Sequence, residues 1–444
     1  MLMKPEKHIL SKSTYIRGLQ CKKSLYLYKN RNFLRDPLSA VQQAKFNRGT
    51  DIGELARQLF PGGINVSPKS PSQYPLSVER TSELIMDTGT SVIYEAAFQH
   101  DKVYVAMDIL VRDGDGWVAY EVKSSLKISD VYMEDVALQY HVISSSGVKL
   151  NDIRILHLNP GYIRADELDI EMLFTEESMF DFAKGRRHFV EFTIPELIDT
   201  CNLSKSPPVE IGPHCLDPYP CEFRGHCWKG VQGNSIVKRD DDTLHLPSIM
   251  PSTIFLEIIA ARPAVPLFPG NSPFHILPAG YSYCDTIGDH QGTHIMNPEN
   301  YNPGVMIKEI TNVIRVAAGI VVYDAEKFQN WLTQWSIDFP ECAADFSLIR
   351  ERFVGIKPLF ASQSTNPLNH KDYELSAIAK ALKIGSLNGL KVTEPALAGE
   401  ICRQALEGGR QVKGFSLRDV EDYLGGTVNA LIEICSQTST DYSA

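Results

Sequence analysis

Met107-Asp108-Ile109 and Tyr120-Glu121-Val122-Lys123 flank the turn-forming sequence Asp113-Gly114-Asp115-Gly116. The segments on either side of the turn, residues 103–111 and 117–122, are rich in Val, Ile, Tyr and Ala, which predicts the two strands of a hairpin. If the hairpin is symmetric about the centre of the turn, Asp108 and Glu121 lie directly opposite each other, with Cβ atoms about 5 Å apart. The sequence therefore predicts a pair of facing carboxylates.

Lys123 joins this pair. Glu121 and Lys123 are two positions apart in one strand, so their side chains leave the sheet on the same face. Two neighbouring carboxylates repel unless a cation or a proton lies between them, and Mg²⁺ prefers such oxygen ligands. We expect the ion to activate water and hold a phosphate oxygen, and Lys123 to position the nucleophile or stabilise developing charge. A surface hairpin with ordinary cross-strand ion pairs is the alternative.

Further polar residues lie on the neighbouring predicted elements. Glu95 belongs to a third predicted strand, residues 92–98, where its neighbours are apolar. A buried carboxylate is costly unless it is paired or bound to a metal ion. An amphipathic helix predicted over residues 130–143 carries Gln139 and Tyr140, and a strand is expected after it near residues 153–158. These residues extend the candidate site beyond the hairpin.

The order of these elements and residues resembles the PD-(D/E)XK nucleases, and most of all the RecB-type and CRISPR-associated iron–sulfur nucleases. The resemblance implies an α/β fold, in which a mixed sheet is flanked by helices. It also implies that Asp108 and Glu121 bind a metal ion together with the carbonyl of Val122. Lys123 would be the catalytic lysine of that family.

The resemblance also assigns roles outside the hairpin. Glu95 would match an additional acidic metal-binding position, and Gln139 with Tyr140 would match the glutamine motif of the catalytic site. The sequence departs from the family at two points. Gly53 stands where relatives often carry a metal-binding His, and Gln139 and Tyr140 are adjacent instead of spaced apart. We expect Glu95 to supply what the missing His does not.

The cysteines are unevenly distributed. Cys215, Cys221 and Cys227 lie close together, and the other six are scattered. A tight cluster in a cytosolic chain favours metal binding over disulfides. The iron–sulfur nucleases hold a 4Fe–4S cluster with one early cysteine and three late ones, so the resemblance implies Cys21 as the fourth ligand. Such a cluster would staple the N-terminal helix to the end of the nuclease core.

Zinc held by the same four thiolates is the alternative, with His214 and His226 as possible substitutes. The closely spaced cysteine pairs that are usual in zinc sites do not occur in this set. The remaining cysteines are expected to be buried structural thiols: Cys201, Cys284, Cys342, Cys402 and Cys435.

Composition and charge exclude several classes of protein. Of 444 residues, 43% are hydrophobic and 22% charged, which excludes a disordered chain. No run approaches the ~20 apolar residues of a membrane helix, and the N-terminus lacks the features of a signal peptide, so we expect a cytoplasmic protein. The net charge is −10, yet residues 1–50 carry eleven Lys and Arg against Glu6 and Asp36. This predicts a local polyanion contact, with a solvated charged surface as the alternative.

The polar segment 229–250 predicts a boundary between two domains. The first, residues 1–235, would contain the nuclease-like core and the four cysteines. The second, residues 251–444, mixes strand-like runs, such as residues 253–259, with predicted helices near residues 374–382 and 397–406. The second half is therefore also expected to be an α/β domain.

This second half resembles a DnaQ-like, RNase H-type exonuclease domain in which acids have been lost. Glu257 stands on its first predicted strand, and Asp324 follows a later one. Ile259 and Gly355 occupy two other positions that are acidic in such domains. Because a two-metal site depends on its acids, we expect a catalytically dead module that binds or scaffolds. An unrelated α/β domain is the alternative.

The combined prediction is a metal-dependent DNA nuclease, an exonuclease or end-processing enzyme of DNA repair, recombination or phage defence. It would use Mg²⁺ or Mn²⁺, bind DNA more readily than RNA, make no membrane contact, and could bind proteins through its C-terminal domain. Two alternatives stay open: a non-catalytic iron–sulfur protein that binds nucleic acid, and a zinc-stabilised scaffold subunit. The sequence lacks a P-loop, so ATP use is not expected.

Overall fold

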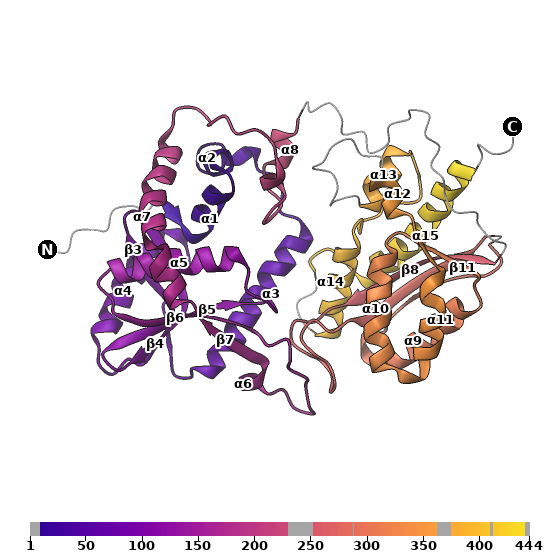
Figure 1. The fold of residues 1–444 in the computed structure, drawn as a ribbon, viewed down its shortest axis with the longest axis horizontal. Coiled ribbons are helices and arrows are strands. Elements are labelled where there is room, and N and C mark those ends of the chain that lie inside the picture. Colours follow the sequence, from indigo (N-terminus) through magenta and orange to yellow (C-terminus); the bar gives the residue numbers. More distant parts are fainter. Residues whose placement is uncertain (1–8, 230–251, 287, 362–373, 409–411, 440–444) are drawn as a thin grey trace. The chain divides into compact units, whose positions relative to one another are not determined.

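The computed structural model describes residues 9–229, 252–286, 288–361, 374–408 and 412–439. Within them the chain divides into two compact units, each with a mixed sheet flanked by helices, so the predicted α/β class is confirmed (Figure 1). Of the described residues, 9–229 and 268–273 belong to the N-terminal unit, and the others belong to the C-terminal unit. Nearly all of the predicted boundary, from residue 230 onward, lies outside the described residues.

The N-terminal unit is built on a seven-stranded sheet. Its strands are β1 (Leu10–Ser11), β2 (Ile64–Asn65), β3 (Val92–His100), β4 (Val103–Asp113), β5 (Gly116–Lys123), β6 (Leu150–Leu158) and β7 (Phe174–Ser178). Its α-helices are α1 (Lys12–Gln20), α2 (Lys22–Asn30), α3 (Ala40–Ala56), α4 (Tyr74–Met86), α5 (Asp130–Ser145), α6 (Ile170–Leu173), α7 (Phe180–Asn202) and α8 (Arg224–Cys227). Short 3-10 helices cover Asn32–Leu34, Arg57–Leu59, Pro71–Gln73 and Pro213–Cys215.

The strand order of this sheet is β2-β3-β4-β5-β6-β7, and β1 pairs with β4 off that path. β3, β4 and β5 form an antiparallel meander, whereas β5 and β6 are parallel and are joined by α5. A parallel pair requires a crossover connection of this kind. The predicted succession of three strands, a helix and a fourth strand is therefore confirmed.

The hairpin of β4 and β5 has the predicted register. Ile109 pairs with Tyr120, and Asp113 pairs with Gly116 at the turn. Gly114 has a φ of 58°, a conformation that glycine adopts without steric cost. One step beyond the Ile109–Tyr120 pair, this register sets Asp108 opposite Glu121.

The alternation of core-facing side chains is interrupted at one level of the sheet. In β4 the core residues are Met107 and then Leu110, and in β3 they are Ile93 and then Ala96. Each step is three residues instead of two. The interruption in β3 contains Glu95, whose φ of 57° lies in the left-handed region. Non-glycine residues rarely adopt this conformation, and those that do gather at functional sites.

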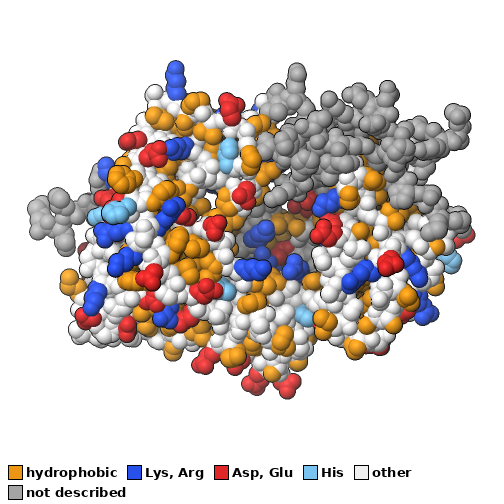
Figure 2. Space-filling model, in the orientation of Figure 1, with side chains coloured by type: hydrophobic (Ala, Val, Ile, Leu, Met, Phe, Trp, Pro, Cys, Tyr) orange, Lys and Arg blue, Asp and Glu red, His pale blue; other side chains and the backbone are white. Residues whose placement is uncertain are grey.

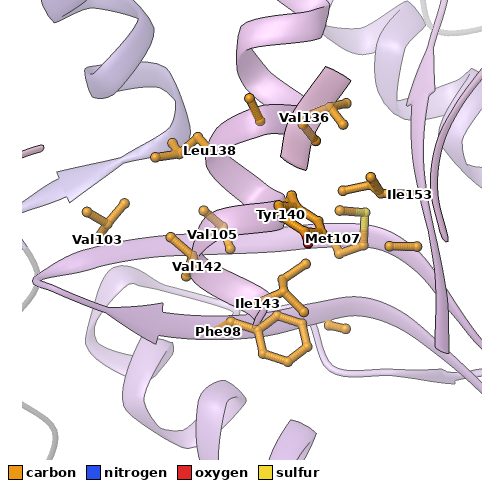
Figure 3. Packing of buried hydrophobic residues seen from close by; sticks show 14 of the residues in the cluster. Phe98, Val103, Val105, Met107, Val136, Leu138, Tyr140, Val142, Ile143 and Ile153 are labelled. Carbon is orange, nitrogen blue, oxygen red and sulfur yellow. The ribbon is translucent and has the colours of Figure 1, made fainter. Parts of the chain in front are cut away.

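Helix α5 covers one face of the sheet and fills much of its core. Nearly every side chain of its second half is buried, and Figure 3 shows them interleaved with residues of the sheet. The helix contributes Val136, Leu138, Tyr140, Val142 and Ile143, and the sheet contributes Phe98, Val105, Met107 and Ile153. α7 packs against α5 from the other side, where the rings of Tyr140 and Phe180 meet edge to face at 5.6 Å.

The C-terminal unit contains β8 (Thr253–Ala261), β9 (Leu277–Asp285), β10 (Gln291–Ile295), β11 (Gly319–Val322) and β12 (Phe353–Gly355). Its α-helices are α9 (Pro303–Arg315), α10 (Ala325–Asp338), α11 (Ala343–Ile349), α12 (Lys357–Ala361), α13 (Leu375–Ala381), α14 (Pro395–Leu406) and α15 (Leu417–Ser439). Single-turn 3-10 helices cover Pro298–Asn300, Pro340–Cys342 and Arg350–Arg352.

Its five strands are ordered β10-β9-β8-β11-β12. β8 pairs antiparallel with β9 and parallel with β11, and β12 continues the parallel half. The predicted strand near residues 253–259 and the two predicted helices correspond to β8, α13 and α14. A core formed by α12, α13 and α15 packs against this sheet.

None of the helices among the described residues combines the length and the apolar character that crossing a bilayer requires.

We expect Leu138→Ala to destabilise the N-terminal unit by about 2–5 kcal/mol, because the side chain is fully buried between α5 and the sheet. Leu76→Ala, the same change at an exposed position of α4, should shift stability by less than about 0.5 kcal/mol. Amide hydrogen exchange of peptides from α5 in increasing urea measures both effects. Equal protection in the two variants would contradict the described packing of α5.

Candidate functional site

Three carboxylates stand in one row across neighbouring strands of the N-terminal unit. The pairs that flank Glu95, Tyr94–Ile109 and Ala96–Met107, set Glu95 level with Asp108. The β4–β5 register then sets Asp108 level with Glu121. Each carboxylate comes from a different strand, so the sheet brings together acids that are far apart in sequence.

Glu121 is almost completely buried, and its oxygens accept several hydrogen bonds. Its Oε1 accepts from the ammonium groups of Lys12 and Lys123, each at 2.6 Å. Its Oε2 accepts from the side-chain amide of Gln139 at 2.9 Å. Lys123 also donates to Asp135 at 2.8 Å. Glu121 is therefore the centre of a buried ionic network whose other members come from α1, β5 and α5.

This network gives the two facing carboxylates, Asp108 and Glu121, different pKa values. Burial opposes the charge of Glu121, but the ammonium groups of Lys12 and Lys123 outweigh it and hold the pKa of Glu121 below its usual range. Burial raises the pKa of Asp108 from 3.8 to about 7, and the nearby charge of Glu121 adds to the rise. Asp108 Oδ2 accepts the backbone N–H of Val122 at 2.7 Å. Near neutral pH one carboxylate is thus charged and the other is poised to take up or release a proton.

Glu95 is held by a different cation. Its Oε1 accepts from the guanidinium of Arg57 at 2.7 Å, and Arg57 in turn lies over the ring of Tyr94. Burial raises the pKa of Glu95, and the charge of Arg57 partly offsets this. The left-handed backbone of Glu95 is therefore combined with an ion pair to the segment that follows α3.

Sequence reasoning missed three residues of this network: Lys12, Arg57 and Asp135. Lys12 and Arg57 lie 109 and 38 positions from their carboxylate partners, a separation that no local pattern reveals. Asp135 could have been found, because it precedes Gln139 by four residues and so shares its helix face. Two buried oxygens, Asp135 Oδ1 and Gln139 Oε1, accept no hydrogen bond from the described part of the chain.

Two other predicted positions lie elsewhere. Tyr140 belongs to the hydrophobic core and points toward Phe180, away from the face of α5 that carries Gln139. Adjacent helix positions are about 100° apart, so one helix cannot aim both residues at the same carboxylates. Gly53 lies in α3 with open space around its Cα, and Arg57, four residues later, is the side chain of this region that reaches the carboxylate row.

The oxygen atoms of this site would suit a hard divalent cation, but cationic side chains already bind some of them. Asp108, Glu121 and the Val122 carbonyl, which stand on adjoining positions of β4 and β5, are oxygen ligands of the kind that Mg²⁺ and Mn²⁺ accept. In the described chain, however, Glu95, Asp108 and Glu121 do not gather oxygens within 4.8 Å of one another. Lys12 and Arg57 are bound to the outer two carboxylates instead.

The four predicted cysteine ligands line one hollow. Cys21 and the cluster Cys215, Cys221 and Cys227 surround a space of about 340 Å³, counting its opening to solvent. All nine cysteines are free thiols, and the five predicted structural ones are buried, as expected. Burial raises the pKa of Cys21 and of Cys227, so four thiolates at this site would require a compensating positive charge.

The sulfur atoms of this hollow are widely spaced. Tetrahedral zinc holds sulfurs at about 2.3 Å and hence about 3.8 Å from one another. Among residues that the structure describes, no three of these cysteines bring their sulfurs within 4.8 Å of one another. His214 also lines the hollow, with its Nε2 3.8 Å from Cys215 Sγ. The spacing is wider than a single zinc ion requires.

Ionic contacts already join the cysteine segment to the N-terminal helices. Glu222 accepts from both Arg17 of α1 and Arg35, which follows α2. The amide of Gln20 donates to the carbonyls of His214 and Tyr219 at 2.8 and 2.6 Å. The hollow therefore lies in a junction that ion pairs and hydrogen bonds also support.

The basic N-terminal segment uses several of its charges inside the unit. Lys12, Arg17, Lys22 and Arg35 all form ion pairs with acids of later elements. On the face of the N-terminal unit shown in Figure 2, basic and acidic side chains are interspersed instead of being gathered by sign. Fewer cations are available for a polyanion than the sequence count indicates.

In the C-terminal unit both retained acids are bound by lysines. Glu257 of β8 is buried and accepts from Lys327 at 3.1 Å, and Asp324 accepts from Lys357 at 2.8 Å. Burial raises the pKa of Glu257, which Lys327 partly offsets. Gly355 lies on β12, with Ala325 3.0 Å from the position of an added Cβ. A lysine thus stands beside each of the two acids.

We expect Asp108→Asn to flatten the pH dependence of stability in a metal-free buffer. A carboxyl whose pKa is raised in the folded state favours folding at low pH, and this contribution is lost as the pH rises from about 4 to about 7, by about 1 kcal/mol per pH unit. Relative to the wild type, the Asn variant should become more stable as the pH rises through this range. The difference in the free energy of unfolding should then stay constant at higher pH. Urea unfolding at several pH values with a chelator present measures this. Parallel curves for the two proteins would contradict the raised pKa.

Comparisons with known proteins add little to this geometry. A scan against models of protein families finds no match, and a search of curated proteins finds none. Among solved structures, one described as the crystal structure of SSO0001 aligns over 46% of this chain and 80% of its own. The two share 12% identity with a TM-score of 0.20, a likeness too weak to carry an argument about fold or function.

Proposed function

We propose that the N-terminal unit is a metal-dependent nuclease of the PD-(D/E)XK type that hydrolyses DNA, as an exonuclease or end-processing enzyme. One observation carries the proposal. Glu95, Asp108 and Glu121 stand in a row on three neighbouring strands, and Lys123 follows Glu121 by two positions with its ammonium on the same network. Burying several acids together with an amine is energetically costly. Such clusters of titratable groups with shifted pKa values occur preferentially at functional sites.

Each residue has a role in this proposal. Asp108 and Glu121, with the Val122 carbonyl, would hold Mg²⁺ or Mn²⁺, which supplies an activated water and a Lewis acid when bound. Lys123 would orient the attacking water or stabilise the charge that develops on the phosphate. Gln139 and Asp135 hold Glu121 and Lys123 in place from α5. Because Lys12 bonds to Oε1 of Glu121, an ion that uses this oxygen must replace the ammonium.

The charges of this network are consistent with reversible binding of a divalent cation. Lys12, Lys123 and Arg57 face four carboxylates, those of Glu95, Asp108, Glu121 and Asp135. A proton on Asp108 balances the network, and its raised pKa describes this state. A divalent ion would replace both that proton and the ammonium of Lys12.

Nucleic acid is the substrate that the surface favours. Phe33 and Phe46 are 77% and 58% exposed, an unusual state for large aromatic side chains. Arg31 and Lys45 stand beside them in the sequence and are also exposed. Exposed aromatic rings that stack on bases, next to cations that contact phosphates, are typical of surfaces for single-stranded nucleic acid. We favour DNA because the nucleases that the chain resembles act on it.

For the four cysteines we propose a 4Fe–4S cluster. The cluster binds each thiolate through a different iron, so its ligands stand farther apart than those of one zinc ion. All four cysteines line one hollow of about 340 Å³, counting its opening to solvent, and this supports a group that is larger than one ion. Nine free cysteines also agree with a reducing compartment such as the cytoplasm.

A second candidate function is a nucleic-acid-binding iron–sulfur protein without turnover. It is favoured by the ion pairs of Lys12 and Arg57, which neutralise the outer carboxylates in the absence of a metal. A zinc-stabilised scaffold is less well supported, because among the described residues no three of these sulfurs lie within 4.8 Å of one another.

We propose that the C-terminal unit is a binding module instead of a second nuclease. Its strand order, three antiparallel strands followed by two parallel ones, agrees with the RNase H-type resemblance. Lys327 and Lys357 occupy the space beside Glu257 and Asp324 that a pair of metal ions would need.

We expect purified protein with Mn²⁺ or Mg²⁺ to cleave DNA, and Asp108→Asn and Lys123→Met to lower the rate by at least about 100-fold. The Asn change keeps an acceptor for the Val122 N–H, and the Met change keeps the aliphatic stem of the lysine. Labelled single- and double-stranded DNA, with RNA in parallel, measures the rate and the substrate preference.

Matched controls come from exposed residues of the same region, Asp115→Asn and Lys127→Met, which should cleave like the wild type. Glu257→Gln should also retain full activity if the C-terminal unit does not cut. Cleavage at the wild-type rate by both Asp108→Asn and Lys123→Met would refute the nuclease. DNA binding without metal-dependent cleavage would support the second candidate function instead.

We expect anaerobically purified protein to be brown and to contain about four iron atoms per chain. Cys21→Ser and Cys221→Ser should lose most of the iron and the visible absorption. Cys201→Ser, a buried thiol outside the hollow, should keep both. A colourless protein that contains zinc and no iron would show that the cluster is wrong.

A further inference from the structure

A second group of metal-ligating side chains lies at the far end of the β3–β4 hairpin. His100 is the last residue of β3, Asp101 belongs to the two-residue turn, and His141 comes from α5. One ligand atom from each side chain lies within 4.8 Å of the other two. His100 is five residues from Glu95 along β3, so at about 3.3 Å per residue the two sites are about 17 Å apart.

The distances in this group approach those of a coordination sphere. Asp101 Oδ2 is 3.3 Å from Nε2 of His100 and 3.9 Å from Nε2 of His141. Ligands at about 2.0–2.1 Å from tetrahedral zinc are about 3.3 Å from one another. The two imidazole rings meet edge to face at an interplanar angle of 70°, and the Nε2 atoms of both face the same oxygen of Asp101.

His141 is the residue that this arrangement leaves unexplained without a ligand. Its side chain is 3% exposed, and neither ring nitrogen has a hydrogen-bond partner among the described residues. Buried polar atoms in proteins are almost always satisfied.

Glu191 of α7 completes the surroundings of His141. Its Oε1 is 4.0 Å from Nδ1 of His141, on the side of the ring away from Asp101. Metal-bound histidines generally present their second nitrogen to a carboxylate or carbonyl, which fixes the tautomer. Arg187 of the same helix donates to Oε1 of Glu191 at 2.8 Å and holds this oxygen in place.

We propose that His100, Asp101 and His141 form a zinc site, in which Nε2 of each histidine and a carboxylate oxygen of Asp101 are the ligands. Two imidazoles and one carboxylate with one open position suit Zn²⁺ among the abundant divalent ions. The ion would clamp the tip of the β3–β4 hairpin to α5, and Glu191 would position His141 for it. This site is independent of the nuclease proposal and of the cysteine hollow.

The test uses the full chain and Co²⁺ as a spectroscopic probe in place of Zn²⁺. Tetrahedral Co²⁺ absorbs in the visible, and cysteine ligands add a strong near-ultraviolet charge-transfer band that imidazole and carboxylate ligands lack. The wild type should show a Co²⁺ site without that band, which zinc displaces. His100→Ala and Asp101→Asn should bind this ion at least about tenfold more weakly, and zinc should raise the Tm of the wild type but not of these variants.

The matched control is His188→Ala, an 88% exposed histidine that contacts the same Glu191 but lies outside the proposed ligand set. It should bind Co²⁺ and zinc like the wild type. Because His100 and Asp101 are at the surface end of the hairpin, their variants can be checked for folding by circular dichroism before titration. Unchanged affinity and stoichiometry in either His100→Ala or Asp101→Asn would overturn the proposal, as would a wild type whose only bound Co²⁺ shows the thiolate band.

Discussion

The buried carboxylate of Glu121 is the constraint on which the candidate site depends. An isolated carboxylate in this position would be protonated or would destabilise the fold, because charge is expensive away from water. Two ammonium groups and one amide, from three different elements, hold it ionised.

The same requirement therefore fixes the neighbours of Glu121. α1 must bring Lys12 to Glu121, and α5 must present Gln139 and Asp135 on one face. Burial, with the charge of Glu121 added to it, then raises the pKa of the facing Asp108. The need to keep Glu121 ionised thus determines which charged and polar side chains surround it.

Much of the N-terminal fold could be predicted from the sequence, because the decisive signals are local. A turn with Gly114 between two β-rich segments fixes the hairpin register, and register alone sets Asp108 opposite Glu121. The convergence of Cys21 on Cys215, Cys221 and Cys227 is a long-range arrangement that spacing could not derive. It was expected only through the family resemblance.

The remaining features depend on tertiary contacts or on departures from regular geometry. Lys12 and Arg57 carry no pattern that points to their partners across the chain. The left-handed backbone of Glu95 breaks the two-residue alternation that sequence reasoning assumes. The family resemblance assigns Tyr140 and Gln139 to one motif, although helix geometry sends adjacent side chains in different directions. No local pattern links His100 and Asp101 to His141, because a turn and a distant helix supply them.

Helix α1 has a further consequence, because its two ends serve different sites. Lys12 is its first residue, and Cys21 is the residue directly after its last one. At 1.5 Å per residue these positions are about 14 Å apart on one rigid rod. A displacement of Cys21 would therefore be transmitted along the helix to the ammonium of Lys12, because one rigid element carries both the thiol and the cation of the carboxylate row.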